Sequence, residues 1–258
     1  MNMDTCDLLG ARVNLLTMTQ LNDIIAATIE SNKKCVLANH NLHSLYLLRD
    51  EAEMRIFFES ADYSHVDGMA LIFLGRCLGL PLMRCHRVTY ADWFPILMRE
   101  SSRQNWRVFY LGSRPGVSEE GAAILRQRFV GLEIATAHGY FDASRGSREN
   151  DNMVNIINRY KPNLLLVGMG MPRQEYWILN NVPNLCANVI LPCGAAMDYV
   201  VGTIPTPPRW VGKIGLEWLS RLVNEPGRLW RRYLLEPWSL LPLFLAALIR
   251  RRVLARKT

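Results

Sequence analysis

The sequence predicts an α/β fold, a doubly wound parallel sheet followed by a helical C-terminal appendage. Short apolar runs alternate with amphipathic segments along residues 19–191, which is the pattern of strands and helices in a parallel sheet. The run at residues 164–167 is aliphatic without polar alternation, as is typical of strands that helices cover on both faces. Three runs end in glycine-bearing turns, where sheets of this kind bind their ligands. The predicted fold is therefore Rossmann-like.

Each element follows from its local pattern. Six segments are short, rich in aliphatic residues and bounded by turn residues, which predicts strands at residues 35–38, 63–66, 106–111, 132–137, 163–167 and 188–191. Six segments have the apolar periodicity of helices, at residues 19–31, 50–61, 91–103, 116–129, 148–160 and 172–180. Because the two kinds alternate, helical crossovers between parallel strands are expected.

A proline-rich stretch at residues 203–208 separates two predicted units, a domain at residues 1–204 and an appendage at residues 205–258. Short helices are expected in the appendage at residues 215–223, 226–235 and 240–253, broken by Pro226, Pro237 and Pro242. The longest apolar run, residues 238–249, is about 18 Å long as a helix. A bilayer core is about 30 Å thick, so this run is not expected to cross one alone.

The net charge of +7 comes from the appendage. Residues 209–258 hold eleven basic and three acidic side chains, whereas the rest of the chain has a net charge of −1. Most of the excess is arginine, which suits bidentate phosphate contacts, and tryptophans interleave with it, which suits a membrane headgroup zone. We expect an anionic membrane surface and an anionic substrate as partners. No nucleic acid is expected, because phosphate contacts alone give no reason for the glycine turns.

The cysteines and the N-terminus indicate where the protein works. The six cysteines contain no C-x-x-C pair and are interpreted as buried free thiols in a reducing compartment. Residues 1–14 contain no long apolar run, so no signal peptide is expected and the protein is expected in the cytoplasm. Trp218, Trp230 and Trp238 of the appendage can equally bury against a second subunit, so a homo-oligomer stays open.

The glycine-bearing turns are candidate phosphate sites. Gly112 and Ser113 follow one strand and lead into a helix, whose free N–H groups and positive end can bind a phosphate. Similar turns contain Gly168 and Gly170, before Pro172, and Gly194. Each turn alone is explained by chain reversal. Three turns at one sheet edge favour a nucleotide or another phosphorylated ligand.

Polar residues follow the first two strands of the predicted sheet. Asn39 and Asn41 follow one of them, and Asp67 follows the other, just before Gly68. An aspartate before glycine is common in plain turns. In a cleft, the same carboxylate can serve as a general base if its surroundings tune its pKa. Both interpretations stay open from the residues alone.

A leaving diphosphate needs positive charge, and the sequence contains no D-x-D pair to hold a divalent metal. The appendage offers arginines instead. Arg221, Arg228 and Arg231 are spaced by seven and three residues, which places them near one face of continuous or stacked helices. A solvated basic face is the alternative interpretation of these three residues.

Four segments carry a resemblance to a known family. They are Val-Asp-Gly at 66–68, Gly-Tyr-Phe at 139–141, Gly-Met-Pro-Arg-Gln-Glu at 170–175, and the stretch from Gly215 through Glu225 to Arg232. On these motifs the chain, from about residue 35 to 233, resembles the WecG/TagA/CpsF family, glycosyltransferase family 26. Its members transfer a sugar from a UDP-sugar to a polyprenyl-diphosphate-linked sugar.

The resemblance implies an inverting transfer that needs no metal and no other cofactor. Asp67 is similar in position to the family's proposed general base. Asn39, which stands where many members have threonine, is expected at the substrate together with Asn41, Arg87 and Gln174. The UDP diphosphate is expected to contact Gly112, Ser113, Asp198, Arg221, Arg228 and Arg231. The appendage is expected to dock peripherally on the cytoplasmic face of the inner membrane, where the lipid-linked acceptor lies.

The transferred sugar is assigned from a shorter segment. Residues 38–47 look most like members of xanthan-type exopolysaccharide pathways, which implies β-1,4 transfer of glucose to a glucosyl-diphosphoprenol. Transfer of ManNAc or ManNAcA from its UDP-sugar, as in teichoic acid or enterobacterial antigen assembly, is the alternative. More distant alternatives are a dinucleotide oxidoreductase, for which a G-x-G-x-x-G turn is missing, and a non-catalytic membrane scaffold.

Overall fold

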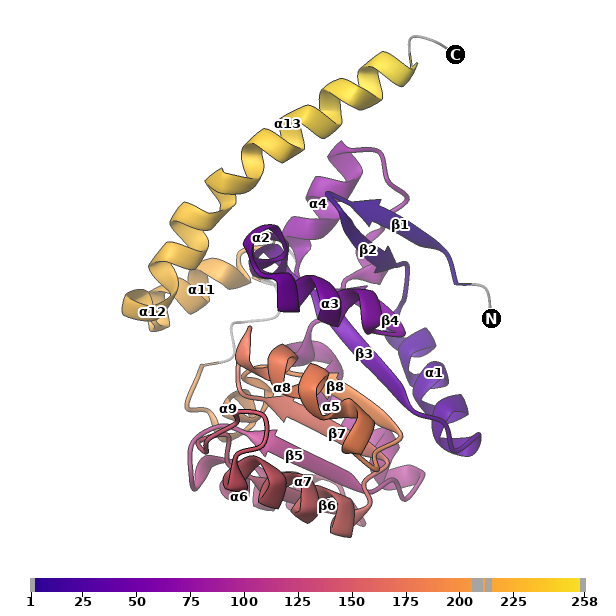
Figure 1. Cartoon of the computed structure of the whole chain (residues 1–258), viewed down its shortest axis with the longest axis vertical. Coiled ribbons are helices and arrows are strands. Elements are labelled where there is room, and N and C mark those ends of the chain that lie inside the picture. Colours follow the sequence, from indigo (N-terminus) through magenta and orange to yellow (C-terminus); the bar gives the residue numbers. More distant parts are fainter. Residues whose placement is uncertain (1–2, 206–210, 212–214, 256–258) are drawn as a thin grey trace.

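The computed structural model describes residues 3–205, 211 and 215–255, and confirms the predicted α/β fold. All neighbouring strands of its six-stranded sheet are parallel and lie in the order β4-β3-β8-β7-β5-β6 (Figure 1). The strands are β3 (Cys35–His40), β4 (Tyr63–Val66), β5 (Val108–Gly112), β6 (Ile134–Ala137), β7 (Leu164–Gly168) and β8 (Val189–Pro192). All six predicted strands are present, with ends shifted by at most two residues.

Helices cover both faces of the sheet. One face packs against α1 (Met18–Glu30), α5 (Tyr90–Arg103), α6 (Val117–Arg128) and α9 (Ala196–Val201). The other packs against α2 (Leu42–Asp50), α3 (Ala52–Ser60), α7 (Arg148–Tyr160) and α8 (Arg173–Asn181). The six predicted helices are confirmed, but α2, α9 and α4 (Met69–Cys77) were not predicted. These three are short, and α4 is apolar nearly all round, so none shows a clear amphipathic period.

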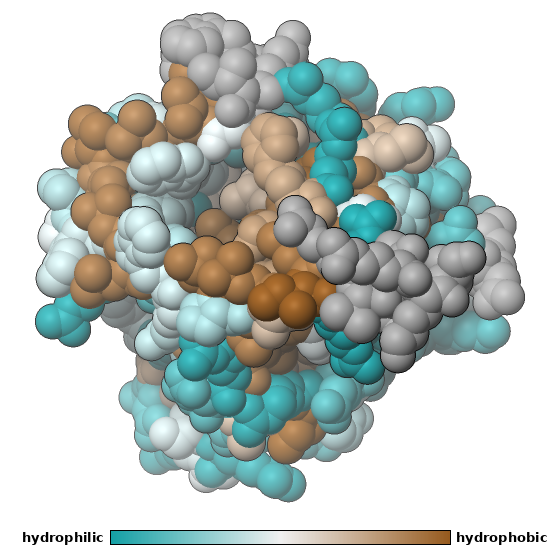
Figure 2. Space-filling view, turned by 90° about the horizontal axis from the view of Figure 1, so that it is seen from above, coloured by the Kyte–Doolittle hydropathy of each residue, from teal (hydrophilic) through white to brown (hydrophobic). Residues whose placement is uncertain are grey.

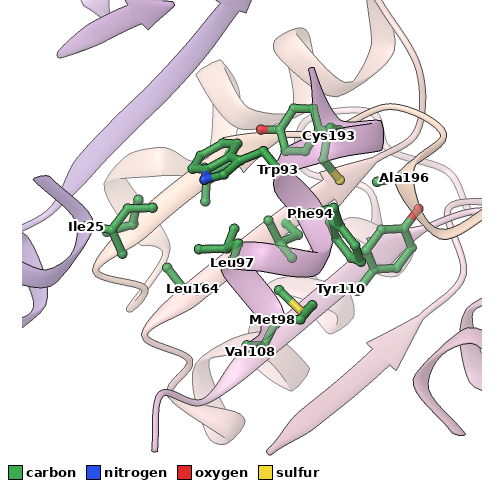
Figure 3. Close-up of a cluster of buried hydrophobic side chains, with 14 of the residues drawn as sticks. Ile25, Trp93, Phe94, Leu97, Met98, Val108, Tyr110, Leu164, Cys193 and Ala196 are labelled. Carbon is green, nitrogen blue, oxygen red and sulfur yellow. The ribbon is translucent and has the colours of Figure 1, made fainter. Parts of the chain in front are cut away.

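The two faces are built by strand alternation. Leu164 and Leu166 of β7 point into one buried cluster, whereas Leu165 and Val167 point into the other. In Figure 3, side chains of α5, among them Trp93, lie against the sheet beside those of β5 and β7. Burial on both sides explains why these strands are continuous aliphatic runs.

A small hairpin outside the main sheet was missed. β1 (Thr5–Leu8) and β2 (Ala11–Asn14) pair antiparallel, with Leu8 opposite Ala11. The two-residue turn has φ of +57° at Leu9 and +89° at Gly10, the backbone that a tight hairpin requires. Leucine is unusual at such a position, so the turn gave no sequence signal. The hairpin packs with α4 into a third cluster.

The appendage is more continuously helical than predicted. It consists of α11 (Glu217–Asn224), α12 (Pro226–Trp230), the π-helical turn η3 (Arg231–Leu235) and α13 (Glu236–Ala255). The expectation that Pro237 and Pro242 break the chain into short helices was wrong, since both lie inside α13. Pro237 directly follows the π-helical turn, and Pro242 removes only one hydrogen bond of a long helix. Half of the predicted linker at 203–208, residues 206–208, lies outside the described residues, and the boundary at 204/205 stays a prediction.

The appendage lies on the body rather than apart from it (Figure 1). α13 runs beside α2, and Leu240 and Phe244 pack into the hairpin cluster. The His43 Nδ1 of α2 lies 2.6 Å from the Glu236 Oε2 of α13, and Arg49 donates to the carbonyl of Ser239 at 2.5 Å. These polar contacts fasten α13 to α2.

The cysteines are only partly as expected. All six are free, but Cys77, Cys85 and Cys186 are exposed, so the expectation that all are buried was wrong. Only Cys35 and Cys193, on or just after strands, are buried.

Candidate active site

Asp67 lies at the carboxyl edge of the sheet, directly after β4. Its backbone N–H donates to the carbonyl of His40 at the end of β3 (2.7 Å). Gly68 then adopts φ +101°, a conformation that favours glycine, and α4 begins at the next residue. The sharp turn leaves the half-buried Asp67 side chain at the edge where doubly wound sheets bind ligands.

The surroundings of Asp67 change the pKa of its carboxyl group. Burial and, second, the negative charge of Glu217 raise its pKa to about 6, while Arg221, Arg87 and a hydrogen bond with Thr89 act in the opposite direction. A plain turn aspartate in water has a pKa near 4. A carboxylate with a pKa of about 6 can both ionise and accept a proton near neutral pH, which is what a general base needs.

Arg87 lies beside Asp67 because the backbone of Arg87 pairs with the end of β4. Arg87 bridges to Val66 in parallel, and Val88 donates to the Val66 carbonyl at 2.8 Å. The Arg87 guanidinium binds Asp92 at 3.1 Å and forms an ion pair with Glu217 of α11. Among the described residues its buried Nε has no partner.

The two predicted asparagines have different environments. Asn39 is buried on β3, in register with His65 of β4, and its Oδ1 has no partner among the described residues. Asn41 is the N-cap of α2, where its Oδ1 accepts from the Ser44 N–H at 3.1 Å. The side-chain oxygen of Asn41 therefore supports the helix, while that of Asn39 is left for another donor.

Gln174 ties two glycine turns together. Its Oε1 accepts from the N–H groups of Gly170 and Gly194, both at 3.1 Å, and its Nε2 donates to the Glu175 Oε1 at 2.8 Å. Gly170 lies in the turn after β7 and Gly194 in the turn after β8. Gln174 therefore shapes the ligand-binding edge from within, and its side-chain oxygen is fully used inside the protein.

Gly112, Ser113 and Asp198 come together as predicted, but away from Asp67. A Cβ on Gly112 would lie 2.3 Å from the Gly168 carbonyl oxygen, so only glycine allows β5 and β7 this close. The Ser113 Oγ donates to the Asp198 Oδ2 at 3.0 Å. In the sheet order three strands lie between β4 and β5, so this trio belongs to the other half of the edge.

The three predicted arginines do not share a face. Arg221 points toward the body, with its Cζ 5.9 Å from the Tyr199 ring centre and its charge acting on Asp67. Arg228 is bound to Glu225 at 3.0 and 2.6 Å, and Arg231 is exposed over the Trp230 ring. The expectation that continuous or stacked helices place them near one face was wrong, because the chain leaves helical geometry at Glu225 (φ −133°) and changes phase again in the π-helical turn.

Three residues near the site were missed. Glu217 and Arg232 come from the appendage. Arg232 is half-buried, and its pKa is lowered mainly by burial and to a lesser extent by the positive charge of Arg221. Glu175 is fully buried, and burial raises its pKa to about 7. An acidic residue in a basic tail was a signal for Glu217. The π-helical turn that directs Arg232 inward had no sequence signal.

Metal ligands are not assembled in the described part of the chain: no three His, Cys, Asp or Glu side chains lie together in a way that suits a metal ion. Among the described histidines, His43 is bound to Glu236. That the transfer needs no metal stays a prediction.

Known proteins similar to this chain identify its family. A family model described as "Glycosyl transferase WecG/TagA/CpsF family" matches residues 6–254. N-acetylglucosaminyldiphosphoundecaprenol N-acetyl-beta-D-mannosaminyltransferases of Staphylococcus aureus strains MRSA252, MW2 and NCTC 8325 are each 25% identical over 241 residues, which cover 90% of this chain and 87% of the relative. With the motifs at Asp67, Gln174 and Arg221 gathered on one sheet edge and its appendage, the chain belongs to the WecG/TagA/CpsF family of glycosyltransferases.

Proposed function

We propose that this glycosyltransferase moves a sugar from a UDP-sugar to a polyprenyl-diphosphate-linked sugar, with Asp67 as general base. The observation that carries the proposal is the position of Asp67, a carboxylate with a raised pKa at the ligand-binding edge of the sheet, faced by Arg87 and Arg221. Buried polar atoms without a partner among the described residues lie in the same region, on Asn39, Tyr90 and Glu175. Sugar hydroxyls supply the matching donors and acceptors.

The chemistry follows from these charges. The acceptor hydroxyl oxygen attacks the anomeric carbon, the new C–O bond forms, and its proton passes to the Asp67 carboxylate. The bond from the anomeric carbon to the diphosphate breaks on the opposite side, so the configuration inverts. UDP leaves with an additional negative charge, which Arg221 and Arg232 are placed to stabilise. Fixed charges of this kind are usually a large catalytic contribution.

The comparisons support the alternative donor better than glucose. The S. aureus relatives are named for transfer of N-acetyl-beta-D-mannosamine to N-acetylglucosaminyldiphosphoundecaprenol, and the match covers most of both chains. We therefore propose UDP-ManNAc as donor and a GlcNAc-diphosphate lipid as acceptor. The glucose donor and exopolysaccharide role, which rest on residues 38–47, have no support from these relatives.

The appendage supports peripheral membrane docking. Residues Pro226–Arg251 form one helical stretch that is long and apolar enough to span a bilayer, about 39 Å at 1.5 Å per residue. The expectation that the appendage does not cross a bilayer alone was based on the apolar run at residues 238–249, and this helical stretch is longer than that run. Its Leu240 packs on the body, however, and a helix that crossed the bilayer would lose that contact. We propose that α13 lies in the plane of the cytoplasmic membrane face.

The free side of η3 and α13 is apolar. Exposed side chains recur every three or four residues, at Leu234 of η3 and at Trp238, Leu241, Leu245 and Ile249 of α13. We call these five residues the lipid stripe. Seen from above, several apolar patches lie among polar side chains on the surface of the molecule (Figure 2). Arg250, exposed in the last part of α13, suits anionic lipid headgroups.

A donor screen tests the proposal. The purified chain is incubated with UDP-ManNAc, UDP-ManNAcA or UDP-glucose and short-chain prenyl-diphosphate acceptors that carry GlcNAc or glucose. We expect a disaccharide from UDP-ManNAc and the GlcNAc acceptor. A product from UDP-glucose alone would establish the other donor, and absence of any disaccharide with every pair would refute the proposed function.

A further inference from the structure

One ion pair joins the appendage to the edge of the sheet that holds Asp67. Glu217, in the first turn of α11, pairs with Arg87, which also binds Asp92 of α5 at 3.1 Å. The Arg87 side chain is 11% exposed and that of Glu217 25%, so the pair is shielded from solvent. Shielded pairs are weakened less by salt than surface pairs, and losing one partner leaves the other charge uncompensated.

The start of α11 is held against the body by close packing as well. Gly215 adopts φ +82°, and a Cβ there would lie 3.1 Å from the Met69 Cβ and 3.3 Å from the Phe73 ring. Both neighbours belong to α4, the helix that begins two residues after Asp67. The packing of Gly215 on α4 therefore places α11, and with it Glu217, next to the turn that holds Asp67.

Glu217 stands out among the charges around Asp67. The groups that face Asp67 are Arg87 and Thr89 from the body, and Glu217 and Arg221 from α11. Further groups that interact with it electrostatically are Arg232, Tyr90 and Tyr199. Glu217 is the one carboxylate in this described set. Its charge opposes ionisation of Asp67, whereas the three arginines favour it.

We propose that Glu217 is a positioning residue of the transferase: its ion pair with Arg87 docks the appendage, and its charge beside Asp67 prepares the base. The inference rests on the proposed function of Asp67 as base. Without Glu217, Arg87 and Arg221 would hold Asp67 as a weaker base. Docking of the appendage thus brings both the cations for the leaving group and the negative charge that keeps Asp67 basic.

The test is Glu217→Gln, which removes the charge and keeps an oxygen that can accept from Arg87. The titration of the Asp67 carboxyl is followed by ¹³C NMR in the full chain, with its signal assigned through Asp67→Asn. We expect the pKa of Asp67 to fall in Glu217→Gln. The acid limb of the pH profile of kcat/KM should move to lower pH by the same amount. A merely structural role of Glu217 would lower the rate without moving either titration.

Glu225→Gln is the matched control, because Glu225 is also an acidic residue of the appendage but pairs with Arg228 at the surface. We expect the pKa of Asp67 to be unchanged in this variant. It should also be unchanged in Glu217→Asp, which keeps the negative charge. An unchanged Asp67 titration in Glu217→Gln, or an equal shift in Glu225→Gln, would overturn the inference. If the pKa of Asp67 falls in Glu217→Gln but the wild-type chain transfers no sugar, the placement of Glu217 is supported and the proposed function is refuted.

Discussion

Arg221 of α11 and Asp67 after β4 interact electrostatically although they come from opposite ends of the chain. Arg221 is aligned by Tyr199 of α9, and its buried Nε has no acceptor among the described residues. A cation held in this way beside the candidate base is well placed for an anionic substrate. The basic appendage is therefore part of the site as well as a candidate for contact with lipid.

Replacing Arg221 should slow transfer by about 100-fold, because a fixed charge on the leaving group is typically worth 10²–10³ in rate. Arg221→Ala is assayed for kcat with a water-soluble acceptor. Arg250→Ala removes an arginine from the distant end of α13 and serves as the control. Equal rates for the two variants would contradict a role of Arg221 at the leaving group.

Replacing Gln174 should destabilise the fold. Gln174→Ala leaves the N–H groups of Gly170 and Gly194 without their acceptor, and each such loss costs about 1–3 kcal/mol. Urea unfolding should show a lower free energy of unfolding. If Gln174 only contacted substrate, KM would rise while the unfolding curve stayed the same.

Glu175 should make stability depend on pH. Its pKa is about 7 in the fold, above its usual 4.5, so the folded state holds the proton more tightly. The free energy of unfolding should therefore fall as pH rises from about 4.5 to 7, by on the order of 3 kcal/mol. Glu175→Gln should flatten this dependence in urea unfolding at several pH values. A wild-type profile as flat as that of the variant would show that burial of Glu175 has no such cost.

The lipid stripe should govern binding to vesicles. Introducing charge with Trp238→Glu and Leu245→Glu together should weaken co-sedimentation with anionic vesicles by at least about tenfold, because charged groups are costly to bury among acyl chains. Val130→Glu, at an apolar residue that is 90% exposed on the body, is the control. If both proteins bind vesicles equally, α13 is not the docking surface.

The sequence predicted the sheet well because its strands are buried on both faces and appear as aliphatic runs such as Leu164 to Val167. Asp67 and Asn39 were singled out because the ends of parallel strands share one edge, whereas Arg87 was expected at the site only from the family resemblance. The appendage was predicted less well. Proline is a strong breaker only on average, and Pro242 lies inside a long helix that packs on the body. The orientation of Arg228, Arg231 and Arg232 depends on a bend at Glu225 and a π-helical turn, which the residue pattern does not encode.

The central claim, that Asp67 is the base of a sugar transfer, is tested most directly by Asp67→Asn. Transfer from UDP-ManNAc to a GlcNAc-diphosphate prenol and the affinity for UDP are measured on the same preparation. We predict that kcat falls by about 10³-fold, within the range for loss of a general base, while UDP still binds. Near-normal turnover in Asp67→Asn would contradict the account.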